Sequence, residues 1–513
     1  MSNSNSSSGA SDSSSEAHQP ETLVSARQVD PCVLVLFGVT GDLSCRKLIP
    51  ALYHLERTDS LPAEFAVVGY ARRAGNDEEL RAYLKKACGP HIDDRETATW
   101  DRLARRIHAT AGLFDDADGL HRLQQKTTEV GRQFGTAGNR MCYFAAPARF
   151  FAGLLDLSFQ AGLIERNDQP TGWSRVIIEK PFGNNLATAQ TLNQEVRRCL
   201  HESQVYRIDH YLGKEAVQNL LVFRFGNSLF EPLWNRRHVD SVQITASESI
   251  GVEGRGAFYE ETGVLRDILQ NHLLQVLSLC AMEPPVSFEA DEVRNMKSQV
   301  LRSLRPVLAH EIDRSIFLGQ YQGYRQEAGV AEESRTPTFV AMRLHLDNWR
   351  WQGIPFYVRA GKCLASRYTE VAIKYRQIPA CLFGTEDVCR LVAPNVLRIR
   401  IQPDSGISLS TNTKVPGEDL TIAHVPMNFR TAEAFDARAP DAYERLLLDC
   451  MRGDPTLFAR RDEVELSWQF VDPIQQAWDQ GRGTLHSYAG GSTGPQEAVR
   501  MPFASGDSWE QSP

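Results

Sequence analysis

The pattern of hydrophobic and polar positions changes once along the chain, near residue 205. Before that point, short continuous apolar runs alternate with amphipathic stretches, as in strands buried on both faces of a parallel sheet with helices between them. This pattern predicts strands at 32–38, 65–71, 141–145 and 175–178, and helices at 43–56, 77–87, 149–162 and 185–200. A βαβ order of this kind predicts a doubly wound α/β sheet of the Rossmann type.

Beyond residue 205, several stretches alternate apolar and polar residues with period two, and few helices separate them. They predict strands at 239–247, 338–346, 356–360, 370–375 and 396–402. Helices are predicted at 214–225, 263–282, 441–451 and 463–478. This order predicts an α+β domain with a large, mainly antiparallel sheet, whose second face must be covered by helices or by a partner subunit.

The two ends of the chain differ from its middle. Nine of the first fifteen residues are serine, which predicts a disordered tail over 1–29. The polar stretch after Ala498 predicts a flexible tail over 499–513. The folded part then divides into a dinucleotide-binding domain over 30–205 and a second domain over 206–498. Because the amino terminus has neither the basic start nor the apolar segment of a signal peptide, we expect a cytoplasmic protein.

Composition narrows the possible partners. The 56 basic and 64 acidic residues give a net charge of -8, which argues against binding to nucleic acid. No run of about eighteen uncharged apolar residues occurs, so no membrane span is expected. None of the ten cysteines forms a Cys-x-x-Cys pair, which argues against a zinc ribbon or a thioredoxin-like motif. Most of them are expected to be small buried hydrophobic residues in a reducing compartment.

A glycine-containing turn joins the first predicted strand to the first helix. Its sequence from Gly38 to Leu43 is GVTGDL. Glycines let the backbone approach a pyrophosphate, and the start of the following helix offers free N–H groups to it. Because the full GxGxxG motif is absent, an ordinary strand–helix turn is the alternative. At the end of the second strand, Arg72 and Arg73 stand where NAD-binding folds place an acid. An arginine there suits a 2′-phosphate and favours NADP, unless both arginines are merely surface charges.

Two further segments carry groups that suit a phosphorylated substrate. Lys180 lies in EKPFG, at the carboxyl edge of the sheet, where it can donate to both substrate and cofactor or simply face solvent. The segment RIDHYLGKE supplies His210, Tyr211 and Lys214, three donors within five residues. Convergent donors of this kind suit a phosphate dianion, and Asp209 beside them could orient a histidine.

His272 lies in an otherwise apolar helical segment, LRDILQNHLLQ, either as a buried structural histidine or as a general base held by a carboxylate. In their order and spacing, GVTGDL, EKPFG, RIDHYLGKE and LRDILQNHLLQ resemble the glucose-6-phosphate dehydrogenase family. The resemblance continues through DNWRW, FYVRAGK, RIQP and the late Gly494-Pro495. It covers about residues 30–498, and RIDHYLGKE is close to a family signature.

The resemblance implies an activity and a set of site residues. Members of this family oxidise glucose 6-phosphate to 6-phosphoglucono-lactone and reduce NADP, in the first oxidative step of the pentose phosphate pathway, as homodimers or homotetramers. His272 matches the general base and Asp209 the carboxylate that orients it. The implied substrate positions are Lys180, His210, Tyr211, Lys214, Glu248, Asp267, Lys362, Arg367 and Gln402. The implied cofactor positions are Gly38, Thr40, Gly41, Asp42, Leu43, Arg72 and Lys180. No metal is implied, because the nicotinamide accepts the hydride.

The sequence also departs from the family. Val39 stands where alanine is usual in the turn, and Phe151 replaces a tyrosine that contacts the cofactor in some members. Some members hold a second, structural NADP on the antiparallel sheet, and Arg359 and Arg400 match part of that set. Its remaining basic and aromatic positions are altered here, which argues against the structural site; they are occupied by Tyr368, Ala372, Ser408 and Ser410.

Two other functions match part of this pattern. A different sugar dehydrogenase with the same plan would lack the phosphate donors of RIDHYLGKE. A phosphosugar- or NADP-sensing protein without chemistry would have lost His272 or Asp209. All of these residues are present, so the sequence favours the phosphosugar dehydrogenase.

Overall fold

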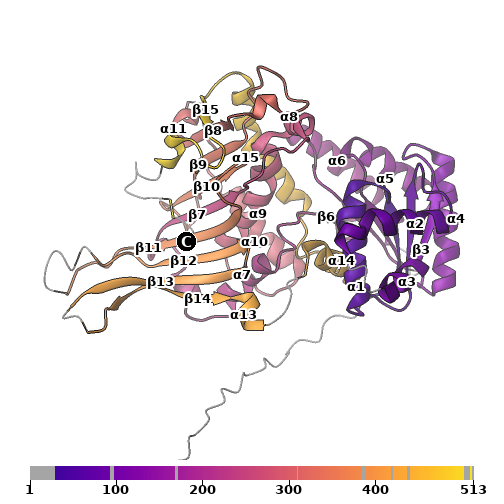
Figure 1. Ribbon diagram of the computed structural model, residues 1–513, viewed down its shortest axis with the longest axis horizontal. Helices are drawn as coiled ribbons and strands as arrows, with labels where there is room; N and C mark the ends of the chain where they lie inside the picture. Colours follow the sequence, from indigo (N-terminus) through magenta and orange to yellow (C-terminus); the bar gives the residue numbers. More distant parts are fainter. Residues whose placement is uncertain are drawn as a thin grey trace, which may run out of the picture.

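The protein has two lobes that lie side by side (Figure 1). The computed structural model describes residues 29–92, 97–167, 172–308, 310–383, 389, 391–417, 420–435, 440–501 and 509–510. The serine-rich stretch expected to be disordered therefore lies, up to residue 28, outside the described residues. Among the helices of the described ranges, none is long and apolar enough to cross a membrane.

The first lobe contains a six-stranded sheet whose strands are all parallel, in the order β3-β2-β1-β4-β5-β6. This order reverses between β1 and β4, and ligands bind at such a reversal, outside the carboxyl ends of the strands. The α/β Rossmann prediction is confirmed. The strands are β1 (Cys32–Phe37), β2 (Phe65–Ala71), β3 (Ile107–Ala111), β4 (Arg140–Phe144), β5 (Ser174–Ile178) and β6 (Val205–Arg207).

Helices cover both faces of this sheet. Alternate residues of β1 belong to two separate hydrophobic cores, with Leu34 and Leu36 in one and Val33 and Val35 in the other. Strands buried on both faces explain the continuous apolar runs in the sequence. The helices are α1 (Ile49–Arg57), α2 (Asp77–Cys88), α3 (Thr97–Arg105), α4 (Ala117–Phe134), α5 (Phe151–Gln160) and α6 (Leu186–Cys199). The sequence pattern did not indicate β3, β6, α3 or α4.

The helix predicted over 43–56 changes type within its length. Residues Ser44–Leu48 form a wide π-helical turn, and α1 then begins at Ile49. Pro50 follows this turn within one continuous helical stretch, so its missing N–H removes a helical hydrogen bond at the junction. The chain therefore meets the proline at a junction of two helical geometries.

The second lobe contains a nine-stranded sheet in the order β14-β13-β12-β11-β7-β10-β9-β8-β15. Among the described residues, β7 pairs with β10 and β8 with β15 in parallel, and the other neighbours are antiparallel, as predicted. The strands are β7 (Val239–Ser247), β8 (Ile316–Tyr321), β9 (Phe339–His345), β10 (Pro355–Gly361), β11 (Tyr368–Tyr375), β12 (Val396–Gln402), β13 (Gly406–Lys414), β14 (Ile422–Arg430) and β15 (Leu485–Tyr488). The pattern had not indicated β8, β13, β14 or β15.

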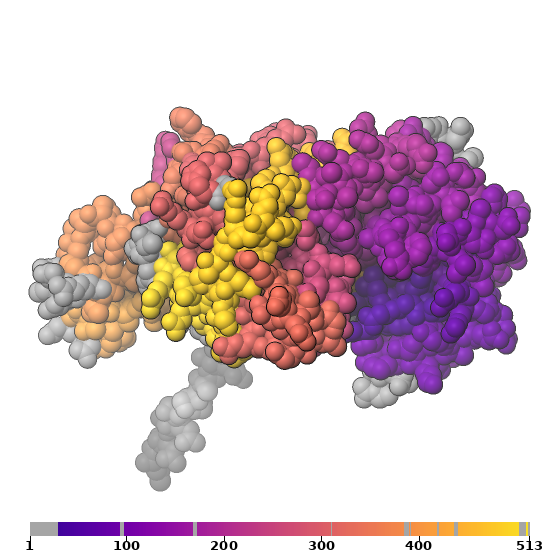
Figure 2. Space-filling model, turned by 90° about the horizontal axis from the view of Figure 1, so that it is seen from above, coloured from indigo at the N-terminus to yellow at the C-terminus, as the bar shows by residue number. Residues whose placement is uncertain are grey.

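The helices of the second lobe lie beside this sheet and between the lobes (Figure 1). The Trp468 indole on α15 donates to the carbonyl of Phe182 in the first lobe, at 3.0 Å. In the space-filling view, carboxyl-terminal residues (yellow) adjoin residues of the first lobe (purple) (Figure 2). The helices are α7 (Glu215–Phe225), α8 (Gly256–Val264), α9 (Leu274–Ala281), α10 (Ala290–Arg302), α11 (Ile312–Ser315), α13 (Thr431–Phe435), α14 (Ala442–Arg452), α15 (Arg461–Asp479) and α16 (Gln496–Val499).

The helix predicted over 263–282 is not uniform either. At Gly263 the backbone adopts φ = 57°, a left-handed conformation that suits glycine. A π-helical segment, Leu265–Leu273, follows it and leads into α9. Segments of this kind are rare and occur frequently at functional sites, and this one carries Asp267 and His272.

Two expectations about the exposed parts of the second lobe differ from the structure. The tail after Ala498 is expected to be flexible, but Trp509 and Glu510 are held against the second lobe. The Trp509 indole donates to the Ala498 carbonyl at 2.9 Å, and Glu510 pairs with Arg398. Cys381 and Cys389 form a disulfide in the loop after β11, so the expectation of buried free thiols is wrong for this pair, which lies outside the apolar core. Seven of the eight free cysteines are buried.

Candidate active site

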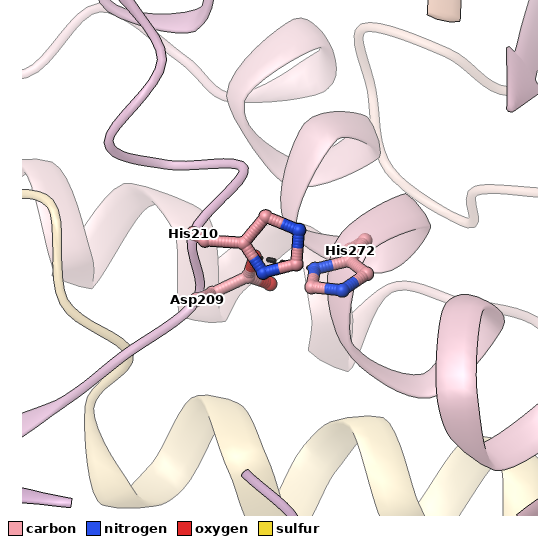
Figure 3. A group of neighbouring side chains, drawn as sticks. All are labelled: Asp209, His210 and His272. Atoms are coloured by element: carbon pink, nitrogen blue, oxygen red, sulfur yellow. Dashed lines mark hydrogen bonds and ion pairs between the residues drawn. The ribbon is translucent and has the colours of Figure 1, made fainter. Parts of the chain in front are cut away.

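The side chains of His272 and Asp209 point toward each other in a buried cluster (Figure 3). Asp209 lies shortly after β6, and His272 lies on the π-helical segment. The His272 Nδ1 is 2.5 Å from Asp209 Oδ1, and both residues are at most 2% exposed. The backbone N–H of Tyr211 donates to the same oxygen at 2.9 Å. With its Nδ1 proton directed at Asp209, the imidazole presents the lone pair of Nε2.

The surroundings keep this imidazole neutral and the carboxylate charged. Burial lowers the pKa of His272; Asp209 opposes that shift and Lys180 adds to it, and the pKa ends below its usual value. For Asp209, burial alone would raise the pKa, but His272 and the Tyr211 N–H together lower it. A neutral histidine beside an ionised carboxylate is the pair that general-base catalysis requires.

Lys180 connects the dyad to the turn at the end of β5. Its ammonium is 2.9 Å from His272 Nε2 and 3.1 Å from both Asp267 Oδ1 and the Asp267 carbonyl. Burial would raise the pKa of Asp267, but Lys180 and Lys362 lower it, so the carboxylate is ionised. The ammonium therefore occupies the position at which a hydroxyl would meet the base, and it is held there by a carboxylate that can also accept from a sugar hydroxyl.

The donors of RIDHYLGKE surround the other side of His272. The Tyr211 ring stacks on the imidazole with a centroid separation of 4.3 Å, and the His210 ring lies at 4.4 Å, edge on. The Lys214 Nζ lies 3.7 Å from the centroid of the Tyr211 ring and donates to Gln402 Oε1. Burial lowers the pKa of Lys214 to about 8, and it lowers that of His210 well below the usual value.

The remaining substrate-side residues are more exposed. Lys362 follows β10 and donates to Glu248 Oε2 at 2.5 Å, at the end of β7. Arg367 is exposed but close enough to Lys214 to lower that pKa further. The structure thus brings a base, several cations and three carboxylates to one place, with Arg367 at its edge.

Asp209, His210 and His272 could by their ligand types hold a metal, since one ligand atom of each lies within 4.8 Å of the others. Two observations oppose a divalent cation there. The Lys180 ammonium already lies against His272 Nε2. The positive charge of Lys214 also lowers the pKa of His210, so both imidazoles already have a cation beside them that would repel a metal ion. We therefore assign the cluster to proton transfer and not to metal binding.

The turn from Gly38 to Leu43 lies at the carboxyl end of β1, next to the end of β2. Gly38 has φ = 75°, and a Cβ there would be only 2.4 Å from the Ala145 carbonyl oxygen, so the tight turn requires glycine. Thr40 and Asp42 border the start of the π-helical turn, and Asp42 is exposed. Val39 is fully buried against Gly69, so its extra bulk points into the core and not toward a ligand.

The end of β2 carries cations and no acid. Arg72 and Arg73 are both exposed and follow Ala71, the last residue of the strand. The residues present therefore fit a dinucleotide with a phosphate on its ribose. The turn and the helix start can bind the pyrophosphate, and the exposed Arg72 side chain can contact a 2′-phosphate.

The arginines that match the second, structural nucleotide site are already paired within the chain. The Arg359 guanidinium donates to Thr245 Oγ1 and to the Tyr368 hydroxyl and lies 4.4 Å from the centre of the Trp509 ring. Arg400 donates to Glu370 Oε2 at 3.0 Å. A nucleotide phosphate would have to displace these partners.

One residue at the centre of the site carried no signal in the sequence. Thr369 is fully buried, and its hydroxyl lies 3.1 Å from Gln402 Nε2 and 3.4 Å from the Tyr211 hydroxyl. A single threonine in a β-strand looks like any other β-branched strand residue. Only the pairing of β11 with β12 places it among the phosphate donors.

Comparison with known proteins gives a consistent result over most of the chain. The family models "Glucose-6-phosphate dehydrogenase, NAD binding domain" and "Glucose-6-phosphate dehydrogenase, C-terminal domain" match residues 35–219 and 221–510. Glucose-6-phosphate 1-dehydrogenase of Chlamydia pneumoniae is 42% identical over 501 residues, 95% of this chain and 97% of the relative. The Bacillus subtilis enzyme of that name is 40% identical, over 94% of this chain and 99% of the relative.

Solved structures agree with the sequence relatives. A glucose-6-phosphate dehydrogenase in complex with its substrate glucose-6-phosphate superposes with a TM-score of 0.86 at 32% identity, covering 95% of this chain and 100% of the other. Glucose-6-phosphate 1-dehydrogenase from Mycobacterium avium gives a TM-score of 0.82 at 34% identity, with 95% and 99% covered.

Proposed function

The chain belongs to the glucose-6-phosphate dehydrogenase family, and on that premise we propose that it oxidises C1 of glucose 6-phosphate to the lactone with NADP as the acceptor. It is an oxidoreductase with a dinucleotide-binding domain. The observation that carries the proposal is the buried dyad, in which Asp209 holds the Nδ1 side of a neutral His272 and leaves Nε2 facing Lys180.

In the proposed reaction, His272 Nε2 takes the proton of the C1 hydroxyl. For this the Lys180 ammonium must leave its position at 2.9 Å from Nε2. It keeps a partner when it does so, because Asp267 already accepts from it at 3.1 Å. Asp209 stabilises the imidazolium that forms, because an ionised carboxylate lies on the other ring nitrogen. The bound dinucleotide supplies the hydride acceptor.

Substrate specificity is assigned to the donors on the far side of His272. His210, Tyr211 and Lys214 form the proposed phosphate site, with Gln402 beside Lys214 and Arg367 at the rim. Glu248 and Asp267 are the proposed acceptors for sugar hydroxyls, with Lys362 bonded to Glu248. A phosphate dianion in this half would replace contacts that the cations now make with neutral or aromatic partners.

NADP is proposed over NAD because the end of β2 carries Arg72 and no acid. Gly38, Thr40, Gly41, Asp42 and Leu43 form the proposed pyrophosphate turn, with Lys180 reaching the nicotinamide side. The turn contributes backbone N–H groups and Arg72 contributes the charge that distinguishes the two cofactors.

A direct assay tests the proposal. Purified protein is mixed with glucose 6-phosphate and either NADP or NAD, and the absorbance of the reduced cofactor is followed, with free glucose as the control substrate. We expect rapid reduction of NADP with the phosphosugar and slow reduction with glucose. No reduction of either cofactor with glucose 6-phosphate would refute the proposed activity.

The assembly belongs to the same proposal: we propose a homodimer, or a homotetramer built from it, in the cytoplasm. Exposed apolar side chains recur along one side of the edge strand β14, at Val425, Met427 and Phe429. Exposed apolar rows of this kind usually mark an interface, and a two-fold, self-complementary contact would cover them.

A further inference from the structure

Four side chains in the phosphate half are linked into a closed ring. The Lys214 Nζ donates to Gln402 Oε1, and Gln402 Nε2 donates to Thr369 Oγ1 at 3.1 Å. Thr369 Oγ1 lies 3.4 Å from the Tyr211 hydroxyl, and the Tyr211 ring lies 3.7 Å from the Lys214 Nζ. Thr369 is the member of this ring that no catalytic or binding assignment above includes.

The fold places these four residues from three separate elements. Tyr211 and Lys214 precede α7, Thr369 is the second residue of β11, and Gln402 is the last residue of β12. Thr369 pairs directly with Gln402 across the strands, next to an irregularity in register between Thr369 and Glu370. Residues that are directly opposite share one face of a sheet, and an irregular step re-aims side chains, so the pair is directed at the same point.

The hydroxyl of Thr369 determines which way the Gln402 amide faces. Because Gln402 Nε2 donates to Thr369, its Oε1 is left to accept from Lys214. The reversed amide would direct its own N–H groups at an ammonium group, which is unfavourable. Thr369 can in turn exchange one hydrogen bond with the Tyr211 hydroxyl, whose ring carries the Lys214 charge on its face.

We propose that Thr369 is a positioning residue for phosphate recognition. Its hydroxyl fixes the Gln402 amide and the Tyr211 phenol, and these two groups hold the Lys214 ammonium where the substrate phosphate binds. The inference rests on the proposed function, since it assumes that the ligand of Lys214 is the phosphate of glucose 6-phosphate. Thr369 is not bonded to the Asp209–His272 pair, so its effect falls on binding and not on proton transfer.

The test compares variants that differ by one hydroxyl. Thr369→Val keeps the shape and removes the hydroxyl, whereas Thr369→Ser keeps the hydroxyl and removes a methyl group. The matched control is Thr245→Val on β7, which removes a buried hydroxyl that is bonded to Arg359 and not to the phosphate donors. For each protein, kcat and KM are measured with glucose 6-phosphate and with free glucose.

For Thr369→Val we expect KM for glucose 6-phosphate to rise roughly five- to tenfold, the cost of a lost hydrogen bond, with kcat and KM for glucose nearly unchanged. Thr369→Ser should restore KM, and Thr245→Val should leave it at the wild-type value. An unchanged KM in Thr369→Val, an equal rise for both sugars, or a failure of Thr369→Ser to restore KM would each overturn the inference.

Two further outcomes are separable. If Thr369→Val does not fold, Thr369→Ala is compared with Thr369→Ser, since these differ only by the hydroxyl, and the same rise in KM is expected between them. If the wild-type protein does not oxidise glucose 6-phosphate, the proposed function fails and this inference with it. An active wild type with an unaffected Thr369→Val variant overturns the inference alone.

Discussion

The substrate side of the site and the dinucleotide turn differ in how far their polar groups are already paired. On the substrate side, the catalytic dyad is buried and Lys180, Lys214 and Lys362 each donate to an acceptor of the chain. On the cofactor side, Asp42, Arg72 and Arg73 are exposed to solvent. The first region is preorganised by internal hydrogen bonds, whereas the second offers its ligand backbone N–H groups and solvated arginines.

The difference has an energetic consequence. A buried charge that loses its partner has little water to replace it, so a change there is costly, whereas an exposed arginine remains solvated whatever its neighbours do. Variants in the dyad should therefore have the largest effects, those in the phosphate half intermediate effects and those at the turn smaller ones.

The largest effect is expected for His272→Asn. Loss of the general base should lower kcat by about 10²- to 10⁴-fold while KM changes little. Asp209→Asn should act on the same step, so the double variant should lose less than the product of the two single effects. His108→Asn, which alters another buried histidine bonded to an aspartate, is the control and should leave kcat near the wild-type value. Near-normal turnover of His272→Asn would refute the assignment of the base.

A smaller but selective effect is expected for Lys214→Ala. Loss of a charge-assisted contact should lower kcat/KM for glucose 6-phosphate by roughly 10- to 100-fold and hardly affect free glucose. Lys85→Ala, which removes an exposed lysine on α2, is the control. Equal losses for the two sugars would place Lys214 outside the phosphate site.

The same lysine predicts a pH dependence. Burial lowers the pKa of Lys214 to about 8, so the ammonium is present below that pH and is lost as the pH rises through it. The phosphate stays a dianion over this range, because its second pKa is about 6. KM for glucose 6-phosphate should therefore rise above pH 8 while KM for glucose stays flat. Lys214→Arg, which does not titrate there, should abolish the rise; a rise that persists would assign it to another group.

A weaker effect is expected at the exposed end of β2. Arg72→Ala should raise the dissociation constant of NADP by about tenfold, the cost of a charge-assisted hydrogen bond, and leave NAD nearly unchanged. Arg132→Ala, an exposed arginine on α4, serves as the control, and binding is measured by fluorescence titration. Equal weakening of both cofactors would show that Arg72 does not contact the 2′-phosphate.

The smallest effect is expected for NADP on assembly. Because Arg359 and Arg400 are already paired with residues of the chain, stripping or adding NADP should not change the dimer in a sedimentation experiment. A clean monomer at micromolar concentration would refute the dimer. A dimer that dissociates only when NADP is removed would refute the claim that the internal pairing of Arg359 and Arg400 makes assembly independent of NADP.

The four central strands of the first sheet could be predicted because the signal for a buried strand lies within its own residues. β1 and β2 are buried along their whole length, so the sequence must carry unbroken apolar runs there. The sequence analysis missed β13 and β14, although residues 407–410 and 425–429 alternate apolar and polar side chains, because neither strand forms a buried apolar run and β14 is exposed along most of its length. Neither π-helical segment could be predicted, since an extra residue in a helical turn hardly disturbs the apolar spacing.

The set of chemical groups can be read directly from the residues: a glycine turn after an apolar strand, arginines at the end of the next strand, and a base, a carboxylate and phosphate donors in two short segments. Which of these groups meet depends on the packing of the chain. Asp209 and His272 are 63 positions apart and bond at 2.5 Å, and Lys214 and Gln402 are 188 apart. Hydrophobic patterning specifies which residues are buried, but a hydrogen bond depends on distance and direction, and only the packing of the π-helical segment against RIDHYLGKE and the register of β11 with β12 set these.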